Sequence, residues 1–195
     1  MRKIFMAFVF VAAFATTTFG ATREDFTLTD QTSVFAQEEA VDAFNFQLTR
    51  MPAAVPQFLK RQGTNILFTE DALTCPGKDC PCDGFCTYSV SDIAVRGSDA
   101  DTIAYRFAHE VGHAVYYATR SKWGAEEKTA MRSLVNFYRE TGCVQEIQNS
   151  ALFTEADVED ECFARCYAVF YGSCTIETIF PGDVVKFMHH VNDLL

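Results

Sequence analysis

Basic residues are scarce in this sequence: 16 Lys and Arg stand against 26 Asp and Glu, and the formal net charge at pH 7 is −10. A protein that binds the phosphate backbone of nucleic acid needs a basic face, and so does one that docks electrostatically on anionic lipid. The composition argues against both kinds of partner. Disorder over most of the chain is also disfavoured, because 49% of the residues are hydrophobic and only 22% are charged.

Long hydrophobic runs are almost absent, and the prominent one lies at the N-terminus. A basic pair at 2–3 precedes an apolar run at 4–15, and the small residues Thr18 and Gly20 stand just before Ala21. This order is typical of a secretory signal peptide that is cleaved before Ala21. The run is shorter than the ~20 residues of a membrane span, which disfavours the alternative of an uncleaved anchor. We therefore expect a secreted, extracellular protein with no membrane contact once the signal is removed.

The length of 195 residues suits one folded domain. We expect a signal peptide at 1–20, an N-terminal segment at 21–54 that is a candidate propeptide or helper helix, and the main domain at 55–195. The expected fold class is α+β, with a small N-terminal sheet followed by helices. Apolar periodicity and turn residues predict an irregular start at 21–35, strands at 65–69 and 87–95, a loop at 75–86, and helices at 37–48, 55–63, 101–120, 125–141, 155–171 and from 181 onward.

Cysteine is missing from the first 74 residues, yet the chain has eight cysteines in the remainder. An even number in an exported chain predicts up to four disulfides. Four cysteines in the segment 75–86 have the spacing C-x4-C-x-C-x3-C, which favours disulfides over a zinc knuckle, because common structural zinc sites use paired C-x2-C. Cys162 and Cys166 either form disulfides, with Cys143 and Cys174 as candidate partners, or act as a metal-binding thiol pair, which an oxidising compartment disfavours.

Histidine is rare, and two of the four histidines stand in the pentapeptide His109-Glu110-Val111-Gly112-His113. Within the predicted helix, positions i and i+4 lie on one face, one turn apart, so both imidazoles can bind one Zn²⁺. Glu110 is rotated by about 100° from His109 and can take a proton from water without being a ligand. Gly112 leaves room for another backbone or a substrate to approach. The alternative, a chance pair of surface histidines, is disfavoured by the apolar surroundings of the motif.

A catalytic zinc site built on an H-E-x-x-H pentapeptide needs a third protein ligand. A third histidine in the pattern H-E-x-x-H-x-x-G-x-x-H is excluded, because Tyr116 and Thr119 stand where that Gly and His would be. The acidic residues just before Glu161 suit the positive end of a helix dipole. Glu161 differs, because it lies deeper in the predicted helix and shares a face with Ala164 and Ala168. Small residues on that face would let the helix pack close to the metal-binding helix, so Glu161 is the candidate third ligand.

The sequence H-E-V-G-H-A-V, followed by Glu161-Cys162-Phe163-Ala164, resembles the E-x-F-A arrangement of the anthrax lethal factor type of zinc peptidase. The resemblance extends over residues 55–195. It implies a gluzincin-like, zincin-like catalytic domain with endopeptidase activity. By this likeness His109, His113 and Glu161 bind one Zn²⁺ and Glu110 is the general base. We accordingly expect a monomer that acts on a protein or peptide substrate.

Two positions depart from that family. Arg165 stands where the family often has an acid that orients a metal-binding histidine. Arg cannot accept the imidazole N–H, so Asp157 or Asp160 is a candidate for that role. Phe153 and Thr154 occupy the region of the family's tyrosine, which leaves the oxyanion-stabilising group unassigned.

These departures motivate two alternatives to a peptidase: a catalytically degenerate secreted binding protein on the same fold, or a disulfide-stapled effector with a chance H-E-x-x-H motif. For the peptidase, the predicted strand at 87–95 would offer a sheet edge to an extended peptide. The tyrosines of the helical half are expected to be core residues: Tyr116, Tyr117, Tyr138, Tyr167 and Tyr171.

Overall fold

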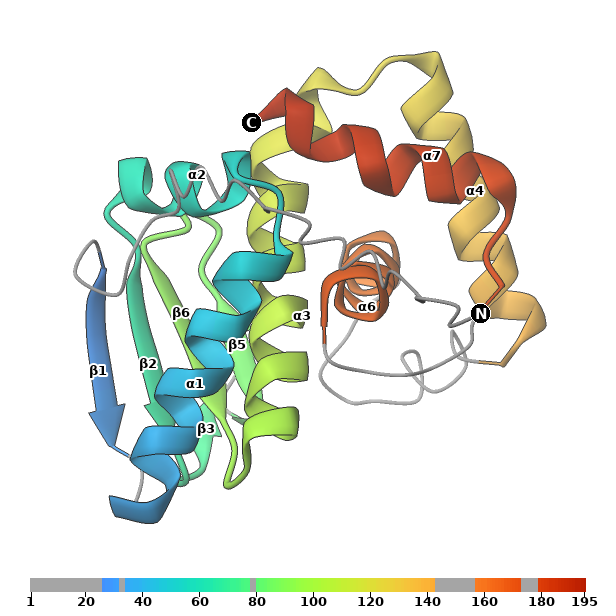
Figure 1. The fold of residues 1–195 in the computed structure, drawn as a ribbon. Coiled ribbons are helices and arrows are strands. Elements are labelled where there is room, and N and C mark those ends of the chain that lie inside the picture. The colour runs from blue at the N-terminus through green and yellow to red at the C-terminus, as the bar shows by residue number, and fades with distance from the viewer. Residues whose placement is uncertain (1–25, 32–33, 78–79, 143–156, 173–178) are drawn as a thin grey trace, which may run out of the picture.

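The computed structural model describes residues 26–31, 34–77, 80–142, 157–172 and 179–195 (Figure 1). These residues form an α+β fold, as the sequence predicts. The strands are β1 (Thr27–Gln31), β2 (Asn65–Thr69), β3 (Leu73–Thr74), β4 (Pro81–Cys82), β5 (Gly84–Cys86) and β6 (Asp92–Arg96). The α-helices are α1 (Val34–Arg50), α2 (Ala54–Gln62), α3 (Ala100–Thr119), α4 (Ala125–Glu140), α6 (Val158–Tyr171) and α7 (Gly182–His190), and short 3-10 turns follow α3 and α7.

The main sheet has the strand order β1-β2-β6-β5, and β3 pairs with β4 in a separate two-stranded ladder. Strands β1, β2 and β6 are parallel, whereas β5 runs antiparallel to β6 and ends the sheet. Helices α1 and α3 lie side by side over one face of this sheet (Figure 1). The core between these layers is aromatic: the ring of Phe44 on α1 lies 6.1 Å from Phe68 on β2 and 5.4 Å from Phe107 on α3. The predicted N-terminal segment is thus joined to the main domain through β1 and α1.

Helix α3 forms the centre of the molecule and carries the H-E-x-x-H pentapeptide. It begins after Asp99, whose carboxylate accepts a hydrogen bond from the backbone N–H of Thr102 at 2.8 Å. This cap satisfies a free donor of the first turn. One side of α3 packs on α1 and the sheet through Phe107, whose ring lies 5.4 Å from Phe44 and 5.9 Å from Phe68. The other side packs on α6, beyond which lie α4 and α7 (Figure 1).

The contact between α3 and α6 is unusually close at Gly112. A Cβ atom on Gly112 would lie 2.8 Å from the Cα of Ala164 and 2.9 Å from the Cβ of Tyr167. Real Cβ atoms do not approach other carbons so closely, so the two helix backbones touch only because position 112 has no side chain. The prediction that Gly112 admits another backbone is confirmed, and so is the prediction that the Ala164 face of α6 packs close to α3.

The helix predictions agree with the structure within a few residues, whereas the strand predictions need correction. Residues 27–31 form β1 and are not irregular, because their backbone pairs with β2 from Thr27↔Asn65 onward. The segment 75–86 is not only a loop, since it contains β4 and β5. The predicted strand 87–95 is a turn followed by β6: the N–H of Val90 donates to the carbonyl of Thr87 at 2.8 Å and reverses the chain. Residues such as Tyr88 and Val90 favour strands locally, but this turn overrides that preference.

Among the described residues, no helix has the length and apolar character needed to cross a membrane. The predicted signal peptide at 1–20 lies outside the described residues, as do Phe153, Thr154, Cys143 and Cys174.

The packing at Gly112 yields a testable expectation. Gly112→Ala should wedge α6 away from α3, lower the free energy of unfolding by roughly 1–3 kcal/mol through overpacking, and weaken binding of a divalent metal by moving Glu161 away from the histidines. Urea denaturation and calorimetric titration with Zn²⁺ measure the two effects. Gly182→Ala is the matched control, because a Cβ at Gly182 meets nothing within 4 Å. Unchanged stability and metal affinity in Gly112→Ala would show that the helices do not need this contact.

Candidate metal centre

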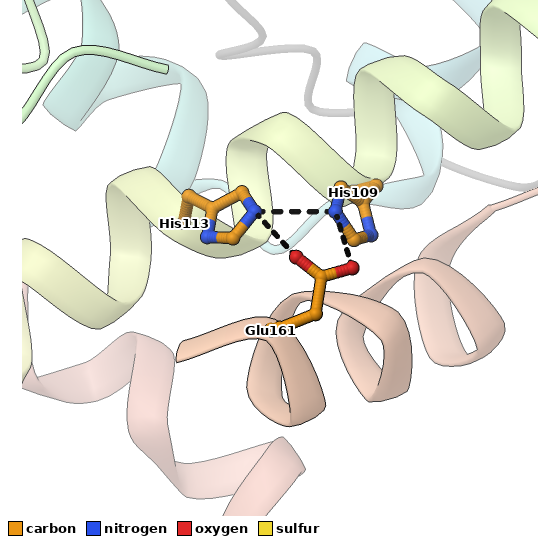
Figure 2. Close-up of side chains that lie close together, drawn as sticks. All are labelled: His109, His113 and Glu161. Carbon is orange, nitrogen blue, oxygen red and sulfur yellow. Dashed lines mark hydrogen bonds and ion pairs between the residues drawn. The ribbon is translucent and has the colours of Figure 1, made fainter. Parts of the chain in front are cut away.

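His109 and His113 present their rings to one another from successive turns of α3 (Figure 2). Their Nε2 atoms are 3.1 Å apart, and both side chains are largely buried, with exposed fractions of 16% and 12%. Helical spacing of i and i+4 produces this arrangement directly from the sequence. Two ring nitrogens therefore converge on one point between α3 and α6.

Glu161 reaches the same point from α6 (Figure 2). Its Oε1 lies 3.5 Å from Nε2 of His109, and its Oε2 lies 3.6 Å from Nε2 of His113. One donor atom from each residue falls within 4.8 Å of the others, so the group could hold a metal ion. Among the described residues, no other trio of His, Cys, Asp or Glu converges in this way, and this includes the four cysteines of segment 75–86. The structure thus brings together the three residues that the sequence singles out.

The hydrogen bonding of Glu161 fits a bound cation. Oε1 accepts a hydrogen bond from Nε of Arg165 at 3.1 Å, whereas Oε2 is buried and has no hydrogen-bond partner. A buried carboxylate oxygen without a donor is costly, and a cation placed between the two histidines and Glu161 would remove that cost. Two imidazole nitrogens and a carboxylate oxygen are a ligand set that suits Zn²⁺ and other divalent transition metals.

Asp160 orients His113 from the position just before Glu161. Its Oδ1 lies 2.5 Å from Nδ1 of His113, and its Oδ2 accepts a hydrogen bond from the hydroxyl of Tyr117 at 2.8 Å. A carboxylate on Nδ1 fixes the tautomer that leaves Nε2 free for a metal. Of the two candidates that the sequence left open, Asp157 and Asp160, the structure places Asp160 in this role.

Tyr117 is not a buried core residue, contrary to the prediction. It lines the candidate site, and its ring stacks on that of His113 with centroids 6.1 Å apart. Burial and the neighbouring Asp160 carboxylate raise the pKa of Tyr117, so its hydroxyl keeps the proton that it donates. The other four tyrosines are buried, as predicted. Tyr117 follows His113 by four residues, so helical spacing alone could have placed it on the same face.

Glu110 is 5% exposed and lies under the edge strand β5. A Cβ atom on Gly84 would lie only 2.5 Å from Oε1 of Glu110, so the glycine gives the carboxylate its place beside the strand. Burial raises the pKa of Glu110 above its ordinary value, because the cost of desolvation exceeds the lowering effect of His113 and His109. A raised pKa suits a carboxylate that takes and returns a proton near neutral pH. No local signal in the sequence points to Gly84.

The candidate centre opens into a cavity of about 850 Å³. His109, Glu110, His113 and Glu161 line it from the helices, and the chain from Cys82 to Tyr88 lines it from the sheet edge. A space of this size and lining suits a ligand larger than a metal ion and its water. The remaining histidines lie elsewhere on α7: His190 is exposed and pairs with Glu127 at 3.6 Å.

The cysteines near the cavity are thiols in this structure: Cys75, Cys82 and Cys86 are free. Burial raises the pKa of Cys82 and of Cys86, and the Glu110 carboxylate adds to the effect in both. Raised pKa values disfavour the thiolate form that binds metals. The disulfides expected in this segment are not formed here and stay a prediction. Cys162 and Cys166 are buried on α6, and their candidate partners Cys143 and Cys174 lie outside the described residues.

Comparison with known proteins does not show a family for this chain. A scan against models of protein families and a search of curated proteins returned no match to the chain. The functional argument therefore depends on the residues themselves.

The contact between Asp160 and His113 predicts a specific loss. Asp160→Asn should weaken the binding of Zn²⁺ or Co²⁺ by about 10- to 100-fold, because the imidazole loses a charged acceptor that fixes its tautomer and raises its basicity. Calorimetric titration measures the affinity. Glu159→Gln is the matched control, since Glu159 is the neighbouring acid on α6 and contacts Tyr116 and Arg120 and not a histidine. Equal losses in both variants would contradict the assigned role of Asp160.

The protonation of His113 predicts a pH dependence. Burial alone would lower the pKa of His113, but the hydrogen bond to Asp160 and the contact with Glu161 outweigh it and raise the pKa well above its ordinary value. Burial alone would raise the pKa of Glu161, but the two histidines hold it well below its ordinary value. In the metal-free protein, His113 therefore keeps a proton that a metal must displace, while Glu161 is already ionised.

Metal affinity should consequently keep rising with pH above about 6.5, the ordinary histidine pKa, and binding should release a proton. Titrations in buffers of different ionisation enthalpy measure both quantities. His190→Ala should leave the profile unchanged, because that side chain lies on α7 and does not line the cavity. An affinity that levels off below the ordinary pKa of histidine, with no proton released, would contradict the pairing of His113 with the two carboxylates.

Proposed function

We propose that the chain is a secreted zinc metallopeptidase with a zincin-like catalytic domain, of the kind that the anthrax lethal factor type represents. The observation that carries the proposal is the convergence of His109, His113 and Glu161, with Glu110 beside them, in the lining of one cavity under a sheet edge. Zinc binding, secretion and membership of that family are all parts of the proposal, and the experiments below test zinc binding and peptide hydrolysis.

The three converging residues would hold one Zn²⁺, which supplies a Lewis acid at neutral pH. Glu110 lies in the same cavity but outside the trio, which suits a general base and not a ligand. It would take a proton from the attacking water and return it to the nitrogen of the leaving amine. The balance is that of hydrolysis: water adds across the peptide bond, the C–N bond breaks, and a carboxylate and an amine are released.

Strand β5 is the element that would align the substrate. Within the described part of the sheet, β5 pairs with β6 on one side only. Its other edge is therefore open to pairing with an extended peptide. The strand expected for this purpose from the sequence, at 87–95, is wrong in detail, because β6 is internal and lies between β2 and β5. Since Gly84 of β5 touches Glu110, a peptide bond aligned there would lie beside the base.

A second candidate is a binding protein on the same fold that holds zinc but does not turn over substrate. The contact of Arg165 with Glu161 favours this alternative, because a guanidinium beside the carboxylate draws negative charge away from the metal. It predicts a zinc-loaded protein that binds peptides and cleaves none.

Two substitutions separate the roles of base and ligand. Glu110→Gln should keep bound zinc and lose at least about 100-fold in peptide hydrolysis, because the amide cannot take a proton. His113→Ala should lose the zinc itself. Elemental analysis of purified protein and a peptide-library digest, each with and without chelator, measure the outcome, and His190→Ala serves as the control.

The other outcomes are equally informative. Full turnover in Glu110→Gln would exclude the assigned mechanism. Zinc with no turnover in the unaltered protein would favour the binding protein. A digest that is insensitive to chelator, from a protein without metal, would mean that the H-E-x-x-H pentapeptide occurs by chance.

A further inference from the structure

Tyr88 is a large aromatic residue that the proposed chemistry does not use. It lies in the turn that follows β5, its exposed fraction is 77%, and it lines the cavity of the candidate metal centre. The other two large hydrophobic residues with high exposure in the described part of the chain, Phe46 and Ile179, do not line this cavity. An exposed aromatic ring that lines a cavity offers a large apolar contact area to a bound ligand.

The turn that carries Tyr88 is held in a strained conformation. Val90 has a φ of 57°, a region that β-branched residues rarely adopt. The structure around it fixes this conformation: the Val90 side chain is buried, and its carbonyl accepts a hydrogen bond from the hydroxyl of Thr64 at 2.7 Å. Within the turn, the hydroxyls of Ser89 and Ser91 lie 2.9 Å apart. Strain that persists under such constraints is typical of functional segments.

The ring of Tyr88 packs against a row of aromatic side chains. Its centroid lies 4.6 Å from that of Tyr117, which stacks on His113 and donates its hydroxyl to Asp160. Tyr117 is therefore fixed by the same carboxylate that orients His113. The row gives Tyr88 a defined place relative to the metal centre although its own side chain is exposed.

We infer that Tyr88 is a specificity-determining residue: its ring packs against an aromatic or large apolar side chain of the bound peptide. The inference depends on the proposed function and deepens it. The ring separations of 4.6 Å and 6.1 Å place Tyr88 within about 11 Å of His113, and an extended peptide advances ~3.3 Å per residue. The recognised side chain thus stands at most about three residues from the bond that is cut.

The charges around the ring favour an apolar partner over a basic one. Two acids that line the cavity already have partners: Asp83 pairs with Arg96 and Arg106, and Asp160 with His113 and Tyr117. Because these acids are already paired within the protein, they offer less to a lysine or arginine placed over the ring than unpaired acids would. Aromatic and aliphatic side chains gain contact area on the ring without needing a counter-charge.

The test uses the zinc-loaded protein and peptides that carry Phe, Leu, Lys or Ala at each position within three residues of the scissile bond. Tyr88→Ala should raise KM for the Phe and Leu peptides about 3- to 10-fold at one position, which is the range expected for an aromatic contact, and leave kcat and the Ala peptides unchanged. Tyr88→Phe keeps the ring and should behave like the unaltered protein. Phe46→Ala, which removes an exposed aromatic ring on α1 outside the cavity, is the matched control.

Equilibrium binding of the same peptides to zinc-loaded Glu110→Gln gives a readout that needs no turnover. Combined with Tyr88→Ala, it should show the same selective loss of affinity. A fall in kcat for Tyr88→Phe would overturn the inference in favour of a role of the hydroxyl in the reaction. Equal losses for all peptides, or a preference for Lys, would overturn it as well. Cleavage that is indifferent to Tyr88 removes only this inference, whereas a protein that neither cleaves nor binds peptides removes the proposed function with it.

Discussion

The contact between α3 and α6 at Gly112 is the constraint on which the candidate site depends. A glutamate side chain spans only a few ångströms, so Glu161 meets His109 and His113 only if the two helix backbones touch. The absence of a Cβ at position 112 and the small side chain of Ala164 allow that contact. Phe163 and Tyr167 flank Ala164 on α6, and both are fully buried against neighbouring aromatic rings. Packing that looks purely structural therefore sets the distance between ligands.

Once the helices touch, the charges within the cavity become strongly coupled. Three carboxylates lie close together, but each has a different environment: Glu161 faces two histidines, Asp160 faces His113 and Tyr117, and Glu110 faces the backbone of β5. The histidines hold the pKa of Glu161 down, while burial raises the pKa of Glu110. Environments that separate the pKa values of neighbouring acids are a hallmark of division of labour at a reacting site. Two glutamates free in water would titrate together.

Sequence reasoning reached the α+β class and the convergence of the histidines with Glu161, because both depend on local signals. Helical spacing predicts the pair at His109 and His113, and small residues on one face distinguish Glu161 from the other acids. The sequence does not predict β1 and β5, because short strands at a sheet edge are defined by pairing with distant residues, as in Gly84↔Val95. The prediction that Tyr117 is a core residue is wrong: helical spacing puts it on the face of His113, and the packing of α6 brings Asp160 opposite its hydroxyl.

The places where local preferences are overruled surround the cavity. Gly112 lies in the middle of a helix, where glycine costs about 1 kcal/mol relative to alanine, and Val90 is the one non-glycine residue with positive φ among those described. The first lets α6 approach α3, and the second turns the chain so that Tyr88 stands at the cavity mouth. Neither the glycine at position 112 nor the positive φ of Val90 is explained by the stability of its own segment. Both become intelligible if the cavity, and not the fold alone, is what the sequence specifies.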